Sequence, residues 1–173
     1  PDIVAGVPCE RFRYAYLRFP PRAALRAALD RKGGNPLCPG IFARLLLEPD
    51  VDLIVCHTAG RLAGVVRTAA ILRGIPYVVV VHGGHADVSA AEQAEMASLF
   101  AGSADALKPL DWVLRPDRFL ADAAAVVALG DDECARLRTA YPQVPVHRLP
   151  NGVDVARFSA VTEEAAQEFR RAR

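Results

Sequence analysis

The chain has 173 residues, a length that fits one domain, and its 52% of hydrophobic residues argues for a buried core and against a disordered chain. Lysine and arginine number 21 against 20 aspartates and glutamates, and this net charge of +1 argues against a nucleic-acid-binding protein. Neither a signal peptide nor an apolar run of the roughly 20 residues that span a bilayer is recognisable.

The first third of the chain predicts one strand and two short helices. Aromatic and apolar residues alternate with arginine over residues 9–17, a pattern typical of a strand with one exposed face. Alanine- and leucine-rich segments predict helices over residues 22–31 and 41–47. Residues 32–36, with the sequence Lys-Gly-Gly-Asn-Pro, predict the loop between these helices.

The rest of the chain repeats a strand–loop–helix order. Continuous apolar runs predict strands buried on both faces over residues 52–56, 77–81, 124–129 and 146–149. Helices are expected over residues 61–73, 89–100 and 107–121, and from residue 131 onward. This alternation predicts a Rossmann-like α/β fold, with a parallel sheet and helices on both of its faces.

Two of these helices carry recognisable signals. In the helix over residues 61–73, Gly74 is a natural stop, and one side is apolar: Leu62, Val65, Val66, Ala69 and Leu72. The helix after residue 130 opens with Asp131, Asp132 and Glu133, where negative charge interacts favourably with the helix dipole. Helix capping explains these three carboxylates, and a catalytic carboxylate cluster is the alternative.

Right-handed crossovers place every strand-to-helix loop of such a sheet at its carboxyl edge, where ligands bind. His82 follows one strand directly and precedes Gly83 and Gly84, which let backbone N–H groups approach a ligand. A neutral imidazole there can bond a sugar hydroxyl, although a histidine that satisfies a local carbonyl would fit the same pattern. His57 occupies the matching place after the preceding strand and either joins the site or braces its loop. Asn151 and Gly152 follow the last strand at the same edge.

Other candidate ligand-binding groups are weaker. Lys32, Gly33, Gly34 and Asn35 resemble a small anion-holding loop without the spacing of a phosphate-binding P-loop. Arg61, at the start of a helix on the ligand edge, is placed to clamp a phosphate or a carboxylate. No aspartate or glutamate joins the histidines at a recognisable ligand spacing, so no metal site is expected.

Two further groups of residues leave alternatives open. The apolar residues Trp112, Val113, Leu114, Phe119 and Leu120 are interleaved with basic ones, which fits either core packing or contact with a membrane surface. The cysteines lack a Cys-x-x-Cys pair, so buried free thiols in a reducing compartment are expected. They are Cys9, Cys38, Cys56 and Cys134.

Four motifs occur in a familiar order. They are Asp-Leu-Ile-Val-Cys-His-Thr at 52–58, Tyr-Val-Val-Val-Val-His-Gly-Gly at 77–84, Ala-Asp-Ala-Ala-Ala-Val-Val-Ala-Leu-Gly at 121–130 and Leu-Pro-Asn-Gly-Val-Asp at 149–154. From Cys9 to Phe158 the chain resembles the N-terminal, acceptor-side domain of retaining GT-B glycosyltransferases of the group 1/family 4 type. The Pro-Asn-Gly-Val-Asp stretch, followed by Arg157 and Phe158, is the most specific piece.

The resemblance implies an enzyme that transfers a sugar from a nucleotide-sugar donor to an acceptor hydroxyl, with retention and without a required metal or other cofactor. It places His82 near the transferred sugar and makes it the expected catalytic residue. The implied partners are the donor, a glycan or lipid-linked acceptor and a C-terminal GT-B domain. A cytoplasmic location is implied, with the inner face of the membrane as a peripheral contact, and cell-envelope or exopolysaccharide glycan synthesis as the process.

The resemblance also sets the expected domain limits. Residues 1–158 form the acceptor-side domain, whose first strand–helix unit is missing, and residues 159–173 begin the interdomain linker or helix. Without the donor-binding half, the chain alone is expected to be inactive. A GT-B epimerase or phosphorylase, and a non-enzymatic Rossmann-like module that binds sugar or phosphate, are the alternatives.

Overall fold

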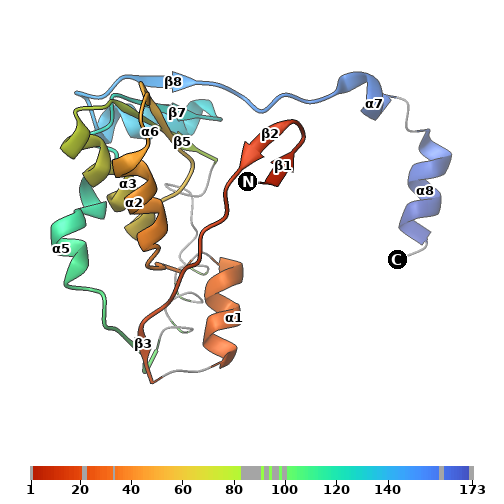
Figure 1. The fold of residues 1–173 in the computed structure, drawn as a ribbon. Helices are drawn as coiled ribbons and strands as arrows, with labels where there is room; N and C mark the ends of the chain where they lie inside the picture. Colours follow the sequence, from red (N-terminus) through yellow and green to blue (C-terminus); the bar gives the residue numbers. More distant parts are fainter. Residues whose placement is uncertain are drawn as a thin grey trace.

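The computed structural model describes residues 2–20, 23–32, 34–82, 91, 94, 98, 101–159 and 162–171. The main sheet has four parallel strands in the order β4-β5-β7-β8. Figure 1 shows β5, β7 and β8 at the top of the view. The strands are Ile54–Cys56 (β4), Tyr77–Val81 (β5), Ala125–Ala128 (β7) and Val146–Arg148 (β8). Val79 of β5 pairs with Cys56 on one side and with Val126 on the other. The predicted Rossmann-like α/β fold is confirmed.

Helices surround this sheet, and α3 packs against β4 and β5 while α6 packs against β7 and β8. Within the described residues, none of them has the length and apolarity that a membrane crossing needs. The bounds are Ala23–Lys32 (α1), Pro39–Leu47 (α2), Gly60–Arg73 (α3), Leu110–Leu114 (α5), Pro116–Arg118 (the 3-10 helix η1), Asp131–Ala140 (α6), Val155–Ser159 (α7) and Glu163–Arg171 (α8). In Figure 1, α7 and α8 lie apart from the sheet. The helix predicted over residues 89–100 falls mostly outside the described residues.

The sheet is buried on one face only. Tyr77, Val79 and Val126 on that face join the main hydrophobic core, which Ala63 of α3 and Leu137 of α6 complete. On the opposite face every residue is at least partly accessible, and the side chain of Val55 in β4 is 52% exposed. The prediction of strands buried on both faces was therefore wrong. A continuous apolar run fits a buried strand, but it does not report how completely each face is covered.

The N-terminal segment differs most from the prediction. Asp2–Val4 (β1) and Val7–Cys9 (β2) form an antiparallel hairpin that ends where the predicted strand begins. Residues 10–17 run without a sheet partner, apart from one bridge between Ala15 and Leu37. Phe12 and Tyr16 are half-buried while Tyr14 between them is exposed, so the alternation of aromatic residues in the sequence does not correspond to a strand. Arg18–Phe19 (β3) then pairs with Ala104–Asp105 (β6).

Two helix predictions need correction. The helix predicted over residues 107–121 is broken after α5, because Pro116 disfavours a helical conformation at the preceding residue and Arg115 adopts a φ of 48°. In α3, Leu72 is 66% exposed, since the buried stripe runs through Val66, Ala69 and Ala70 instead. Gly74 ends α3 as predicted, with a left-handed φ of 66°.

The acidic start of α6 is confirmed as the first turn of that helix. Asp131 and Asp132 are exposed there, but Glu133 is buried and its Oε1 has no hydrogen-bond partner. Asp131 forms an ion pair with Arg148 of β8, at 3.1 Å between the carboxylate and Nε. Cys38, Cys56 and Cys134 are buried free thiols, and burial raises the pKa of Cys56 despite its contact with the backbone of Thr58.

Gly64 allows α3 to lie close to the segment that follows α5. A Cβ added there would lie 3.1 Å from the backbone oxygen of Leu114 and 3.3 Å from the nitrogen of Pro116. Because backbone atoms cannot move aside cheaply, Gly64→Val is expected to destabilise the protein by about 1–3 kcal/mol in urea denaturation. Ala43→Val, on the exposed side of α2, is the control for a β-branched residue in a helix. Equal stability of both variants would contradict this packing.

Candidate functional site

Two histidines meet at the carboxyl edge of the sheet. β4 ends at Cys56 and the adjacent β5 ends at Val81, so the next residues, His57 and His82, emerge side by side. Nδ1 of His57 lies 2.7 Å from Nε2 of His82, and the rings are stacked with centroids 5.0 Å apart and planes inclined by 21°. Both side chains are exposed. The parallel register therefore builds a hydrogen-bonded imidazole pair facing solvent.

The contact fixes the arrangement of His82. In a hydrogen bond between two imidazoles one ring nitrogen donates and the other accepts, so the tautomer of one ring determines that of the other. Nδ1 of His82 has no hydrogen-bond partner among the described residues. His57 thus orients the ring of His82, and whether it also joins a ligand site or braces its loop stays open to test.

Arg61, predicted to clamp a ligand, has its guanidinium turned inward. The residue is 1% exposed, with Nε 2.8 Å from Asp111 Oδ1 and Nη2 2.8 Å from Asp105 Oδ2. Its Nη1 donates to the backbone oxygen of Asn35. Burial alone would lower the pKa of Arg61. The hydrogen bonds to Asp105 and Asp111 outweigh this effect, so the pKa of Arg61 is raised above its ordinary value. These contacts tie the start of α3 to α5 and to the loop before α2.

The described part of the predicted anion-holding loop packs within the protein. Oδ1 of Asn35 accepts the backbone N–H of Arg61 at 3.3 Å, which satisfies one of the free N–H groups at the start of α3. Gly60, with a φ of 67°, leaves room for Asn35, because a Cβ there would lie 2.1 Å from its Oδ1. At Gly34 a Cβ would lie 2.6 Å from the ring of Tyr16. Gly34 is thus required for close packing against Tyr16. The side chain of Asn35 is already hydrogen-bonded to the backbone of Arg61.

The structure describes several other predicted site residues only in part or not at all. Gly33, Gly83 and Gly84 lie outside the described residues, and Lys32 is described only as the last residue of α1. Asn151 and Gly152 are exposed beyond β8. Among the described residues, no interaction joins these two to the histidine pair. Their roles remain predictions.

Within the described part of the chain, no three His, Cys, Asp or Glu side chains are grouped so as to hold a metal ion.

Sequence comparison identifies the family. The model of the glycosyl transferase 4-like domain matches residues 4–152. The chain belongs to the glycosyl transferase 4-like domain family. No curated protein and no solved structure matched it.

Membership of this family confirms the resemblance to group 1/family 4 glycosyltransferases and supports a transferase function. The order of motifs along the chain was therefore sufficient to find the family. The structure places His57 and His82 at the carboxyl edge of the parallel sheet, and their role in binding stays a prediction.

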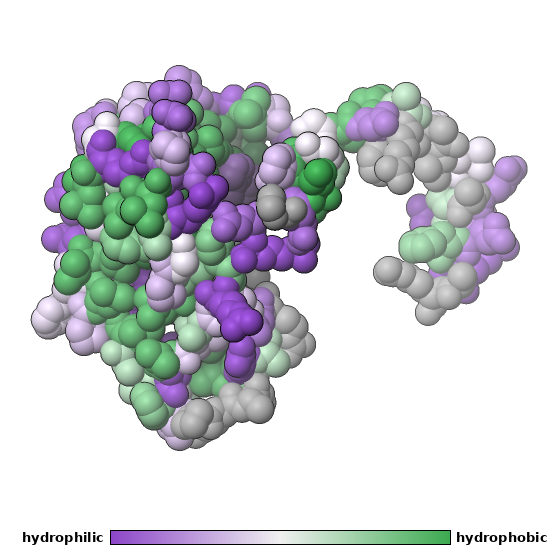
Figure 2. All heavy atoms as spheres, viewed as in Figure 1, coloured by the Kyte–Doolittle hydropathy of each residue, from purple (hydrophilic) through white to green (hydrophobic). Residues whose placement is uncertain are grey.

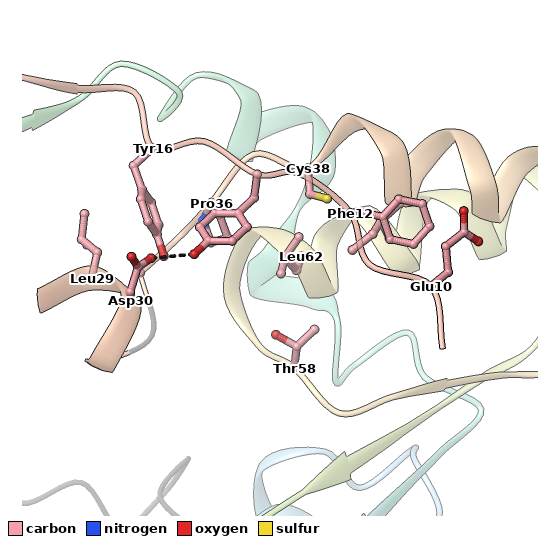
Figure 3. A pocket seen from close by; sticks show the side chains of 12 residues that line it. Glu10, Phe12, Tyr16, Leu29, Asp30, Pro36, Cys38, Thr58 and Leu62 are labelled. Carbon is pink, nitrogen blue, oxygen red and sulfur yellow. Dashed lines mark hydrogen bonds between the residues drawn. The ribbon is translucent and has the colours of Figure 1, made fainter. Parts of the chain in front are cut away.

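Beside the histidine pair lies a pocket that the sequence analysis missed. It has a volume of about 410 Å³, and Thr58, the residue after His57, belongs to its lining together with Tyr14, Tyr16 and Asp30 (Figure 3). Residues far apart in the sequence build it, so only the aromatic content of residues 12–16 hinted at a binding surface.

The apolar cluster at residues 112–120 is only partly buried. Leu114, Phe119 and Leu120 are buried, as core packing predicts. Trp112 is 81% exposed and Val113 is 70% exposed at the surface of α5. Figure 2 shows hydrophobic residues gathered on the face of the molecule that carries α5.

Proposed function

We propose that the protein transfers a hexose from a nucleotide-sugar donor to a hydroxyl of a glycan or lipid-linked acceptor, with retention of the anomeric configuration. In this proposal a second domain of the GT-B architecture grips the donor, the domain described here holds the acceptor, and the chain alone is inactive. The reaction serves the synthesis of a cell-envelope or exopolysaccharide glycan. Family membership supports sugar transfer. The single observation that supports the carboxyl edge as the site of transfer is the histidine pair.

The proposed chemistry uses His82 as a hydrogen-bonding group. The acceptor oxygen replaces the nucleoside diphosphate at the anomeric carbon, the departing diphosphate takes up the proton of the acceptor hydroxyl, and positive charge develops on the sugar as the bond to the diphosphate breaks. Through Nδ1, His82 bonds a hydroxyl of the sugar in transit, while its Nε2 is held by His57. A group already oriented before the reaction stabilises the transition state without reorganisation. No metal or other cofactor is required by this scheme.

The test is a product analysis with the full-length protein. Uridine-, guanosine- and thymidine-diphosphate hexoses are each incubated with methyl hexosides as acceptors, and the products are followed by NMR. The expected product is a new glycoside with the anomeric configuration of the donor sugar. An isomerised nucleotide sugar would identify an epimerase instead, and cleavage of a glycoside by inorganic phosphate would identify a phosphorylase. Binding of sugars without any reaction would favour a non-enzymatic module.

We also propose that the protein is cytoplasmic and touches the inner face of the membrane through α5. Trp112 and Val113 project from this helix, and Lys108, 73% exposed, precedes them. Exposed apolar side chains flanked by basic ones favour the interface of an anionic bilayer.

Trp112→Ser is expected to lower the fraction of full-length protein that sediments with phosphatidylglycerol vesicles, by about tenfold in the partition coefficient. The loss follows from the apolar area that tryptophan would bury in the interface. Leu47→Ser, which removes a side chain 80% exposed at the end of α2, is the matched control and should leave the partition unchanged. Equal losses for both variants would contradict a contact specific to α5.

A further inference from the structure

The pocket beside the histidine pair has the size of a small-molecule site. It lies between the extended segment after β2, helix α1 and the start of α3, and its volume of about 410 Å³ falls within the range of ligand pockets. Leu29 and Leu62 supply apolar lining, while Thr58 lies at its lower side in Figure 3. The extended segment, α1 and the start of α3 thus form the walls of the pocket, and the fold fixes their positions.

Aromatic rings form much of its wall. Tyr14 and Tyr16 meet edge to face, with centroids 5.6 Å apart and planes inclined by 74°, and Phe12 lies further along the same segment. The C–H-bearing face of a pyranose is an apolar surface that packs well on such rings. Because the two tyrosine rings are nearly perpendicular, a sugar ring stacks on the face of one and meets the edge of the other.

The polar groups of the pocket suit hydroxyls. Asp30 Oδ1 accepts the hydroxyl of Tyr14 at 2.9 Å, and the other carboxylate oxygen retains acceptor capacity. Burial, followed by interaction with Asp30, raises the pKa of Tyr16 to about 12, so this phenol is a neutral donor at physiological pH. Glu10 adds a second carboxylate, held by Arg44 Nε at 3.0 Å.

The charge of the lining argues against anionic ligands. Glu10 and Asp30 are acidic, and no basic side chain is among the described residues that line the pocket. Arg44 pairs with Glu10, and Arg26 acts on Tyr14 and Tyr16 from outside the lining, so Asp30 carries the negative charge of the pocket. The diphosphate of a nucleotide sugar would be repelled here, whereas sugar hydroxyls would donate to the carboxylates. Of the two substrates in the proposed reaction, only the acceptor matches this chemistry.

We propose that this pocket binds an uncharged pyranose unit of the acceptor, stacked on Tyr14 and Tyr16 and hydrogen-bonded by Asp30. That the bound sugar is part of the acceptor rests on the proposed function. Its place in the fold supports it, because Thr58 lines the pocket and directly follows His57. A sugar seated here lies next to the edge at which His82 is placed to act.

Binding to the full-length protein tests the pocket independently of catalysis. Methyl hexopyranosides, methyl glucuronide and hexose 6-phosphate are titrated separately, and their dissociation constants are measured by ligand-observed NMR. We expect at least one neutral hexoside to bind more tightly than either anionic sugar, and Asp30→Asn to weaken its binding about tenfold. Asp52→Asn, which alters an exposed aspartate outside the pocket, is the control and should bind as the wild type does. Tighter binding of the anionic sugars, no binding of any neutral hexoside, or an unchanged affinity of Asp30→Asn would overturn the proposal.

Steady-state kinetics distinguish an error in the pocket assignment from an error in the proposed function. With an active wild type, Asp30→Asn should raise the KM for the acceptor about tenfold and leave the KM for the donor unchanged. Transfer by the wild type together with an unchanged acceptor KM in Asp30→Asn would refute the pocket alone. Hexoside binding that Asp30→Asn weakens, in a protein that transfers no sugar, would retain the sugar pocket and refute the transferase.

Discussion

Replacing Arg61 by leucine is expected to lower the free energy of unfolding by about 3–5 kcal/mol, the typical cost of removing one partner from a buried ion pair. Asp111 is 8% exposed, and its Oδ1 and Oδ2 both accept from the Arg61 guanidinium. Asp105 and the backbone oxygen of Asn35 share the same guanidinium. Leucine would remove the Arg61 donors of Asp111 Oδ1 and Asp105 Oδ2, which is costlier than the loss of an exposed charge, and would leave Asp111 with Lys108 at 3.4 Å.

Urea denaturation followed by circular dichroism measures this effect, and Arg11→Leu is the matched control. Arg11 also pairs with an aspartate, at 3.5 Å from Asp2, but the two side chains are 77% and 61% exposed. Such surface pairs contribute about 0–1 kcal/mol, so this variant should unfold close to the wild type. If both leucine variants unfolded at the same urea concentration, the buried network would not stabilise the fold as described.

The second large effect is on catalysis. His82→Ala in the full-length enzyme is expected to lower kcat by about 10²-fold or more, the scale of losing one positioned group that stabilises the transition state. Folding should survive, because the imidazole is exposed and its removal leaves no core cavity. Steady-state kinetics and a melting curve on the same sample measure both quantities. His147→Ala, which alters an exposed histidine of β8, is the control.

His57→Ala should reduce kcat less, since His57 acts on His82 and not on the sugar. Groups that act as a unit are not additive, so the double variant should be no slower than His82→Ala alone. Losses that multiply in the double variant would refute the coupling of the two rings. A His82→Ala protein that melts early yet keeps full turnover would identify a structural histidine.

Much of the central fold could be predicted from local patterns. The apolar runs around Val79 and Val126 indicate strands, because a buried strand is hydrophobic whatever its neighbours are. Gly74 indicates the end of a helix, because glycine readily adopts the left-handed φ found there. Parallel topology then placed His57 and His82 at one edge. Their direct contact is confirmed by the structure, although only the shared edge was predicted.

The errors came from contacts between distant residues. Arg61 was predicted to face a ligand, but its carboxylate partners are 44 and 50 residues away in the sequence, and no local pattern reports such a pairing. Residues 9–17 alternate like a strand because Phe12 and Tyr16 pack on other elements. The acidic, aromatic pocket was missed for the same reason, since the chain assembles it from separate segments.

We propose that sugar transfer takes place at the carboxyl edge beside His82. The most direct measurement is a crystal structure of the full-length protein with the nucleotide sugar that the product analysis selects. We predict that the sugar lies at this edge, with one of its hydroxyls within hydrogen-bonding distance of Nδ1 of His82. A sugar bound at the opposite end of the strands, or one out of reach of the His57–His82 pair, would contradict the account.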